Sequence, residues 1–321
     1  MLALCALWGC GDSDGSPAKA SAKEAAGSAR AIAAFAQFPE ASNLVIGIDV
    51  AAIQKSPLWQ RLGPQMTARV PSLAKLSSAC GFDPLTKVRA IVIGGDMTSD
   101  DNAILTIKGL SRKDLAACAG GTKAASGVLS ELTIGDSVLW IAWTGKDELL
   151  MSPRVEMKAG APAATLATGK KWLADRAKGT GGLDHNAAAM ALLGAVDTGA
   201  NVWFVALPNP KLPMSVDGNE SRGAYGTVAV GDGLALAITL RMESAEVAAE
   251  VVDKANTVLA MLEQHPRYGD LVKALTVSIA ATDSAVTLKA SFSAESLDEV
   301  TNKAKNLAPA IFGDASKAAP E

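Results

Sequence analysis

Side chains that could carry out catalysis are scarce in this sequence. It contains two histidines, His185 and His265. His185 stands between an aspartate and an asparagine just before an apolar run, and both neighbours are typical of a helix start. His265 precedes Pro266 where a long helix is expected to end, a place at which the helix dipole favours a cation. Neither histidine belongs to a catalytic motif, so we interpret both as structural or surface residues.

Two other patterns match chemical sites in form only. Residues 11–15 read G-x-S-x-G, the pattern of a hydrolase nucleophile elbow, which needs a strained turn between a strand and a helix. No strand is expected before this segment. Asp96, Asp100, Asp101 and Asn102 gather side-chain oxygens within seven residues, but their spacing differs from that of a calcium-binding EF-hand loop. Hairpin turns favour the same residue types, so we predict a turn, with an ion site as the alternative.

The N-terminal cysteine points to a membrane anchor. Residues 1–9 are apolar and end in glycine, Cys10 follows, and the next residues are small and polar. Leu7, Gly9 and Cys10 resemble the lipobox of bacterial lipoproteins. The resemblance implies a lipid on Cys10, a signal peptide at residues 1–9 and a place in the cell envelope. No Lys or Arg precedes the apolar run, as an export signal normally requires, and truncation of the signal at its start would explain this. A buried N-terminal strand or helix is the alternative. Two or three acyl chains give stable attachment to a membrane. Because Gly11 rather than aspartate follows the cysteine, we favour the outer membrane.

Two cysteines remain for the body of the protein. Cys80 and Cys118 form an even pair in a chain expected to be exported, which favours a disulfide bond. Closing a loop of that length stabilises a fold by about 3–4 kcal/mol in the chain-entropy model. Two buried free thiols are the alternative. A zinc site is not expected, because neither cysteine has another cysteine or a histidine at ligand spacing.

The start of the body resembles a group of exported proteins. Residues 38–49 and the following Ser56-Pro57-Leu58 are similar to the start of uncharacterised bacterial lipoproteins of the myxobacterial type. The likeness covers about the first half of the body and implies a strand that ends in aspartate, followed by a helix. Those families bring no known activity, cofactor or catalytic residue.

Composition argues against several classes of partner. The 30 basic and 33 acidic residues give a net charge of −3, and no basic stripe is present, so nucleic acid is not expected as a partner. Aromatic residues make up only 4% of the chain, which leaves few platforms for stacking bases or sugars. No run reaches about 18 consecutive apolar residues, so we expect no membrane-spanning helix and a soluble body.

A strand-turn-strand-helix unit recurs along the body. Its strands alternate apolar and polar residues, as antiparallel strands that cover a core on one side do. A serine opens the helix that follows, and Ser111 and Asp114 have the spacing of a capping box. The unit predicts an α+β fold of antiparallel sheets with helices packed on one face, in two related halves built from ββα units. Chance similarity of generic units is the alternative. The three copies span residues 88–118, 225–264 and 275–307.

Further elements frame these units. We predict a strand at residues 44–50, helices at residues 53–62 and 71–79, and a hairpin that turns at Gly135-Asp136. The second strand of this hairpin, residues 138–144, is apolar on both faces and should lie inside its sheet. Trp140 and Trp143, three residues apart on it, should point to opposite faces and pack rather than bind a sugar.

The predicted organisation follows from these elements. The segments are a signal peptide at 1–9, a lipid-anchored tether at 10–39, a first half at 40–155, a joint at 156–184, a second half at 185–310 and a tail at 311–321.

These features favour a non-catalytic cell-envelope lipoprotein, attached to a membrane by its lipid, whose body binds a partner or has a structural role. One alternative is a carrier of a lipid or another apolar ligand, because sheets with Ala, Thr and Ser on their second face could form a concave wall. The other alternative is an enzyme without a recognisable motif. We expect no cofactor and no metal ion.

Overall fold

The computed structural model describes residues 29, 31–67, 77–78, 80–96, 103–117, 122–126, 128–134, 137–157, 163–208, 215–216, 219–266 and 269–296. The strands of the first half are β1 (Leu44–Ile48), β2 (Ala90–Gly95), β3 (Ile104–Lys108), β4 (Thr122–Ser126), β5 (Leu129–Ile134), β6 (Ser137–Trp143) and β7 (Glu148–Met157). Those of the second half are β8 (Val202–Ala206), β9 (Ser215–Val216), β10 (Asn219–Glu220), β11 (Gly223–Val230), β12 (Leu234–Arg241), β13 (Thr276–Thr282) and β14 (Ala285–Phe292).

The helices are fewer than the strands among the described residues. They are α2 (Val50–Lys55), α3 (Pro57–Thr67), α5 (Arg112–Ala116), α6 (Ala163–Ala177), α7 (Ala187–Ala195), α8 (Ala245–Gln264) and α9 (Gly269–Lys273). Two 3-10 turns, Pro84–Thr86 and Leu183–His185, a helical turn at residues 31–35, and short helical pieces at residues 29, 77–78, 80 and 294–296 are also described. Within this described part of the chain, no helix is both long and apolar enough to cross a membrane.

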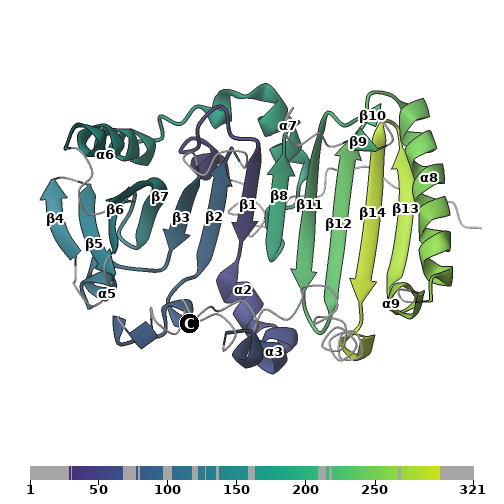
Figure 1. Cartoon of the computed structure of the whole chain (residues 1–321), viewed down its shortest axis with the longest axis horizontal. Helices are drawn as coiled ribbons and strands as arrows, with labels where there is room; N and C mark the ends of the chain where they lie inside the picture. Colours follow the sequence, from purple (N-terminus) through teal and green to yellow (C-terminus); the bar gives the residue numbers. More distant parts are fainter. Residues whose placement is uncertain are drawn as a thin grey trace, which may run out of the picture.

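Twelve of the strands form one continuous antiparallel sheet (Figure 1). The order is β4-β5-β6-β7-β3-β2-β1-β8-β11-β12-β14-β13, so the strands of residues 44–157 all lie on one side of those of residues 202–292. The halves meet at the seam, which is the pairing of β1 with β8 from Leu44 opposite Ala206 to Ile48 opposite Val202. The predicted α+β fold with antiparallel strands is confirmed, as one continuous sheet.

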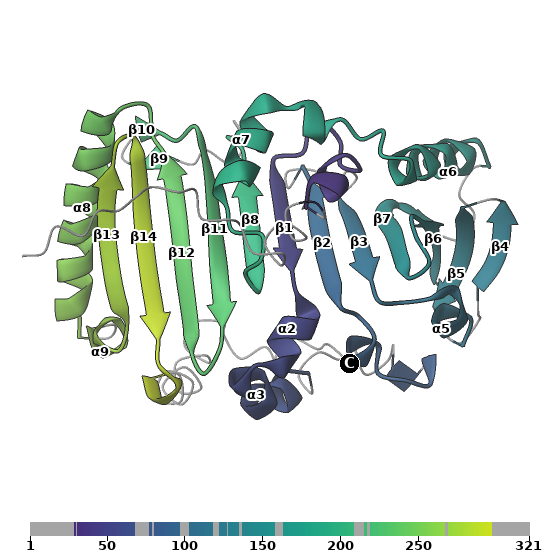
Figure 2. The same ribbon diagram turned by 180° about the vertical axis from the view of Figure 1, so that it is seen from behind.

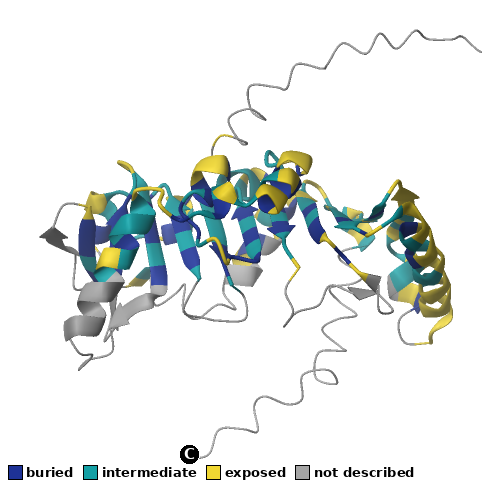
Figure 3. Ribbon diagram, turned by 90° about the horizontal axis from the view of Figure 1, so that it is seen from above, coloured by how far each residue is buried: buried dark blue, intermediate teal, exposed yellow. Residues whose placement is uncertain are grey.

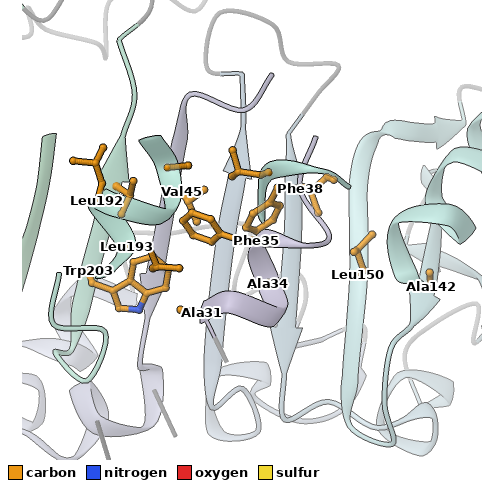
Figure 4. Packing of buried hydrophobic residues seen from close by; sticks show 14 of the residues in the cluster. Ala31, Ala34, Phe35, Phe38, Val45, Ala142, Leu150, Leu192, Leu193 and Trp203 are labelled. Atoms are coloured by element: carbon orange, nitrogen blue, oxygen red, sulfur yellow. The ribbon is translucent and has the colours of Figure 1, made fainter. Parts of the chain in front are cut away.

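The largest core cluster spans the seam on one side of the sheet (Figure 4). The rings of Phe35 and Phe38 meet edge to face with centroids 6.4 Å apart, and Trp203 of β8 lies 6.5 Å from Phe35. Leu173 of α6 and Leu192 of α7 join the same cluster. Both halves therefore share one core on this side, which we call the core side.

The body begins earlier in the chain than the sequence predicts. Ala31, Ala34, Phe35 and Phe38 are buried and recur three and four residues apart, as on one side of a helix. The Phe38 ring packs on Gly94 of β2. The prediction of a tether at residues 10–39 is therefore wrong for its last part, because the side chains of residues 31–38 pack on the sheet and belong to the core.

The opposite side carries two smaller clusters. One joins Cys80, Leu115 of α5 and Trp143 of β6. The other joins Val251 of α8 and Val286 of β14. Helices thus pack on both sides of the sheet, and the prediction of helices on one face is wrong.

Strand β7 shows why both sides need cover in the first half. Its adjacent residues Leu149 and Leu150 point to opposite faces and are both buried, one in each cluster. A strand that is apolar on both faces needs packed side chains on each of them. The prediction for β6 is confirmed for the same reason, since β6 lies between β5 and β7.

The helix predicted at residues 53–62 is broken in two. Ser56 has an extended backbone, with φ −70° and ψ 145°, and separates α2 from α3. A residue before proline is disfavoured in the helical region, and Pro57 follows Ser56. The Ser56 hydroxyl donates to the Ile53 carbonyl and accepts from the Trp59 amide, so it closes one helix and caps the next. The helix predicted at residues 71–79 lies almost wholly outside the described residues.

The predicted joint between the halves is largely a helix. α6 occupies residues 163–177 of the expected joint at 156–184 and packs on β6 and β7. It therefore packs against the strands of residues 137–157 rather than forming a free linker.

Candidate functional site

One side of the last four strands gathers residues of a distinctive kind. Alternate residues of a strand point to opposite faces, and the pairings of β11 with β12, β12 with β14 and β14 with β13 are in continuous register. Four residues of each strand therefore share the core side of the sheet, and we call this surface the open face. They are Gly223, Tyr225, Thr227, Ala229, Ala235, Ala237, Thr239, Arg241, Ala285, Thr287, Lys289, Ser291, Thr276, Ser278, Ala280 and Thr282.

Among the described residues, the open face is covered at one end only. Leu192 of α7 lies against Gly223, and Thr239 in the next strand is buried. Beyond that end, Ala229, Ala235 and Ser278 are exposed. A hollow of about 390 Å³ lies over the uncovered part, and its floor contains Thr227, Ala229, Ala235, Ala237, Thr276, Ser278, Lys289 and Ser291. On this side, no described helix crosses β12, β14 and β13 (Figure 2).

The charges of the open face all have the same sign. Lys289 and Arg241 are its charged residues, and none of its sixteen positions holds aspartate or glutamate. The guanidinium carbon of Arg241 lies 5.8 Å from the ring centre of Tyr225, so the two side chains stand on the same side of the sheet. A cationic surface on a chain of net charge −3 would attract a carboxylate or a phosphate group.

Small side chains make the rest of the open face flat. Thr239 and Thr287 join β12 to β14 through a hydrogen bond of 3.1 Å between their hydroxyl oxygens. The remaining uncovered positions are mostly alanine, serine and threonine. Such short side chains let a bound chain or surface approach the backbone of the sheet closely.

The reverse of these strands is entirely different in character. It carries Leu240, Val286 and Ile279, which pack with Val251 of α8. The four strands are thus amphipathic, with an apolar side beneath α8 and a small, polar and cationic side that no described helix covers beyond its α7 end.

Of the three cysteines for which the sequence predicts a lipid or a disulfide bond, the structure describes only Cys80. Cys10 and Cys118 lie outside the described residues. Cys80 is buried and belongs to the same cluster as Leu115, which precedes Cys118 by three positions. This closeness supports the expected bond between Cys80 and Cys118, which stays a prediction.

Neither histidine lies in the open face. The His185 side chain is 82% exposed, and its Nε2 stands 3.8 Å from a carboxylate oxygen of its neighbour Asp184. His265 is the C-terminal cap residue of α8, as its place before Pro266 predicts, and its amide donates to the Leu262 carbonyl. Among the described residues, no three His, Cys, Asp or Glu side chains are grouped as metal ligands.

Of the predicted oxygen-rich turn, one residue can be placed. Asp96 accepts a hydrogen bond of 2.8 Å from the side-chain amide of Asn43. Asp100, Asp101 and Asn102, like the G-x-S-x-G segment at residues 11–15, lie outside the described residues.

Trp140 and Trp143 lie on opposite faces of β6, as predicted. Trp140 is buried in the core-side cluster and Trp143 in a cluster of the other side. The ammonium of Lys170 lies 3.6 Å from the Trp140 ring centre, and the indole of Trp143 donates to the Ser130 hydroxyl. Both tryptophans are packing residues.

Comparisons with known proteins add a distant likeness of fold. No family model matches the chain, and no curated protein matches it. Three crystal forms of TP0453 are similar in structure. Form I has a TM-score of 0.43 at 9% identity and covers 83% of this chain and 95% of that one. Forms III and IV each have a TM-score of 0.45, at 9% and 8% identity, with 83% of this chain and 96% and 95% of theirs covered.

Proposed function

We propose that this protein is a non-catalytic cell-envelope lipoprotein, anchored by a lipid on Cys10, whose body binds an acidic partner protein through the open face. The observation that carries the proposal is a four-stranded surface with cations and no carboxylates, most of which no described helix covers. Like-signed charge on one surface steers association with an oppositely charged partner. The outer membrane is the favoured location.

Comparison of the two halves supports the proposal, because one described helix of the first half has no described counterpart in the second. Counted outwards from the seam, β1, β2 and β3 occupy the places that β8, β11 and β12 occupy on the other side. A short helix precedes each seam strand, at residues 31–35 and in α7, and both helices join the core-side cluster. α5 and α8 follow the third strand of each half, and both pack on the other side. These matches favour the two related halves expected from the ββα units.

The same comparison assigns a counterpart to the open face. Hairpin β6–β7 lies outside β3 as hairpin β13–β14 lies outside β12. α6 covers β6 and β7 on the core side, whereas no described helix covers β13 and β14 there. The helix expected after β14, within residues 275–307, lies mostly outside the described residues. No described helix of the second half fills the place that α6 fills in the first, and we propose that a partner does.

The residues of the open face suit binding rather than catalysis. Its serine and threonine hydroxyls have no histidine or carboxylate beside them within the sixteen positions, and a hydroxyl nucleophile needs such a base. Lys289 provides a positive charge that can bind an acidic group of a partner.

A second candidate is a carrier of a ligand with an apolar part and an anionic group. The hollow of about 390 Å³ is the observation in its favour, because ligand pockets measure about 300–1,000 Å³. Its alanine and threonine floor would take the apolar part, and Lys289 the anionic group.

Position-specific photo-crosslinking in cells tests the open face. A photo-reactive amino acid at exposed Ala235 should give one adduct of defined mass, and the same group at Gln60, exposed on α3, should not. Lys289→Glu should reduce the adduct about threefold or more, because it reverses the charge. Lys146→Glu, which changes an exposed lysine in a loop of the first half, is the matched control. Adducts of small mass that extract with lipid would favour the carrier, and equal crosslinking from both positions would contradict both candidates.

Labelling with a fatty acid tests the anchor. In a host that processes lipoproteins, a chain with a complete signal peptide should take up the label. Label that persists in Cys10→Ser would refute attachment at Cys10.

A further inference from the structure

Strand β13 ends the sheet and pairs with β14 alone among the described strands. Its seven residues, Thr-Val-Ser-Ile-Ala-Ala-Thr, include no charge and no proline, and its register with β14 has no bulge. An edge strand of this kind presents backbone N–H and C=O groups that can pair with another chain.

The other edge of the sheet differs in each of these respects. β4 has a register shift between Ala124 and Ser126, and its sequence includes Lys123. Bulges and lysines are the usual protection of edge strands against further pairing. Among the described strands, one edge therefore carries these protections and the other does not, which is the pattern expected where pairing is useful.

Helix α8 provides an apolar neighbour for a strand added at β13. It lies beside β13 at the end of the sheet in both views (Figures 1 and 2), and its outer residues are exposed (Figure 3). Val258 and Leu262 stand seven and eleven positions after buried Val251, so they belong to the sheet-facing stripe of the helix. Yet they are 54% and 38% exposed, and Met261 is 67% exposed. The sheet-facing stripe of α8 is thus longer than the part that the sheet covers.

We propose that β13 takes up an extended segment of a partner polypeptide as a thirteenth strand. This inference rests on the proposed partner-binding function and names how the partner is held. The segment would alternate apolar residues, which extend the cluster under α8, with small or acidic residues on the side of the open face.

Lys289 defines the preferred charge of the added segment. It pairs with Ser278 of β13, and an added residue opposite Ser278 would lie two strands from Lys289, about 10 Å away. Because the Ser278 side chain is short, the long Lys289 side chain can extend over it towards the added strand. An acidic residue opposite Ser278 could then pair with Lys289.

The charges disfavour a second copy of this chain as the occupant. β13 has no acidic residue to offer Lys289 of another copy. Antiparallel pairing of two β13 strands about a two-fold axis would also set two α8 helices side by side on the same face. Each α8 carries four acidic residues and one lysine, so the two helices would repel.

A peptide built on β14 tests the proposal, because β14 already shows which sequence pairs with β13. The probe is Ala-Val-Thr-Leu-Glu-Ala-Ser-Phe, the sequence of β14 with glutamate in place of Lys289, labelled with a fluorophore. One control peptide keeps the lysine. A second control has two N-methyl groups on the backbone amides that would bond to β13. Affinities come from fluorescence anisotropy with the whole protein, and hydrogen exchange reports which amides are protected.

We expect the glutamate peptide to bind and to slow exchange in residues 276–282 but not in residues 122–126. N-methylation should weaken binding about tenfold or more, because two backbone hydrogen bonds are lost. The lysine peptide should bind about threefold more weakly, and Lys289→Glu should reverse this preference while Lys146→Glu leaves it unchanged.

Three results would overturn the proposal that β13 takes up a thirteenth strand. They are absence of binding, binding that N-methylation does not affect, and a dimer of the free protein in which residues 276–282 are already protected. Any of them leaves crosslinking from Ala235 as a separate test of the open face, so the two proposals can fail independently.

Discussion

Replacing Gly47 by alanine tests whether one aromatic contact sets the packing of the seam. Gly47 of β1 stands opposite Trp203 of β8, and a Cβ atom on it would overlap the Trp203 indole. Trp203 is 6% exposed and packs against Phe35, so the ring has little room to move. Overpacking of a core costs about 1–3 kcal/mol. Alanine is itself about 0.5–1 kcal/mol better than glycine within a strand. We therefore expect Gly47→Ala to lower the free energy of unfolding by about 1–2 kcal/mol.

The sign of this effect should reverse when the indole is removed. Trp203→Ala alone should cost about 3–5 kcal/mol, since it deletes a buried aromatic side chain. In that background the alanine at position 47 meets no ring, and only the gain of about 0.5–1 kcal/mol remains. The coupling energy between the two positions is then about 1–3 kcal/mol.

Urea unfolding followed by circular dichroism measures all four proteins of this cycle. Gly194→Ala is the matched control, because Gly194 lies in α7 with open space around it. That change should raise the free energy of unfolding by up to about 1 kcal/mol. A Gly47→Ala effect of the same sign and size in both backgrounds would refute the contact.

Two further predictions concern the first half. Peptide mapping without reduction should find Cys80 linked to Cys118, and Cys118→Ser should lower the free energy of unfolding by about 3–4 kcal/mol; two free thiols on alkylation would contradict the bond. Hydrogen bonds from the Ser111 side chain and amide lower the pKa of Asp114, so their contribution is present at neutral pH and is lost as the pH falls through that lowered pKa. Ser111→Ala should therefore cost about 1 kcal/mol near pH 7 and less in the acid range, and a cost that is equal at pH 7 and pH 3 would count against this cap.

Local features of the fold could be predicted because they depend on neighbouring residues. The Ser111–Asp114 capping box is present as predicted, with the Ser111 hydroxyl accepting from the Asp114 amide at 3.2 Å. Ser244 caps α8 in the same way, by accepting from Val247. The hairpin of β11 with β12 also follows from alternation and a short turn.

The features that could not be predicted depend on distant pairings. The break at Ser56 was available from the proline rule, but the seam was not, since nothing near residue 47 identifies residue 203 as its partner. The open face likewise depends on pairings between strands that the sequence alone does not identify. Lys289 and Arg241 are ordinary alternating residues in their own strands, and only the order β12-β14-β13 brings them onto one carboxylate-free surface.

The seam also has a consequence for how the chain folds. Its two strands are more than 150 residues apart, whereas β2–β3, β11–β12 and β13–β14 are formed by near neighbours. Contacts between distant segments form slowly, so each half should acquire its hairpins before the halves join. During that interval β1 and β8, with the uncharged sequences Leu-Val-Ile-Gly-Ile and Val-Trp-Phe-Val-Ala, would each have an unpaired edge. Such strands pair readily with wrong neighbours. The strands that unite the finished sheet are therefore those at which an unfinished chain is most exposed to aggregation.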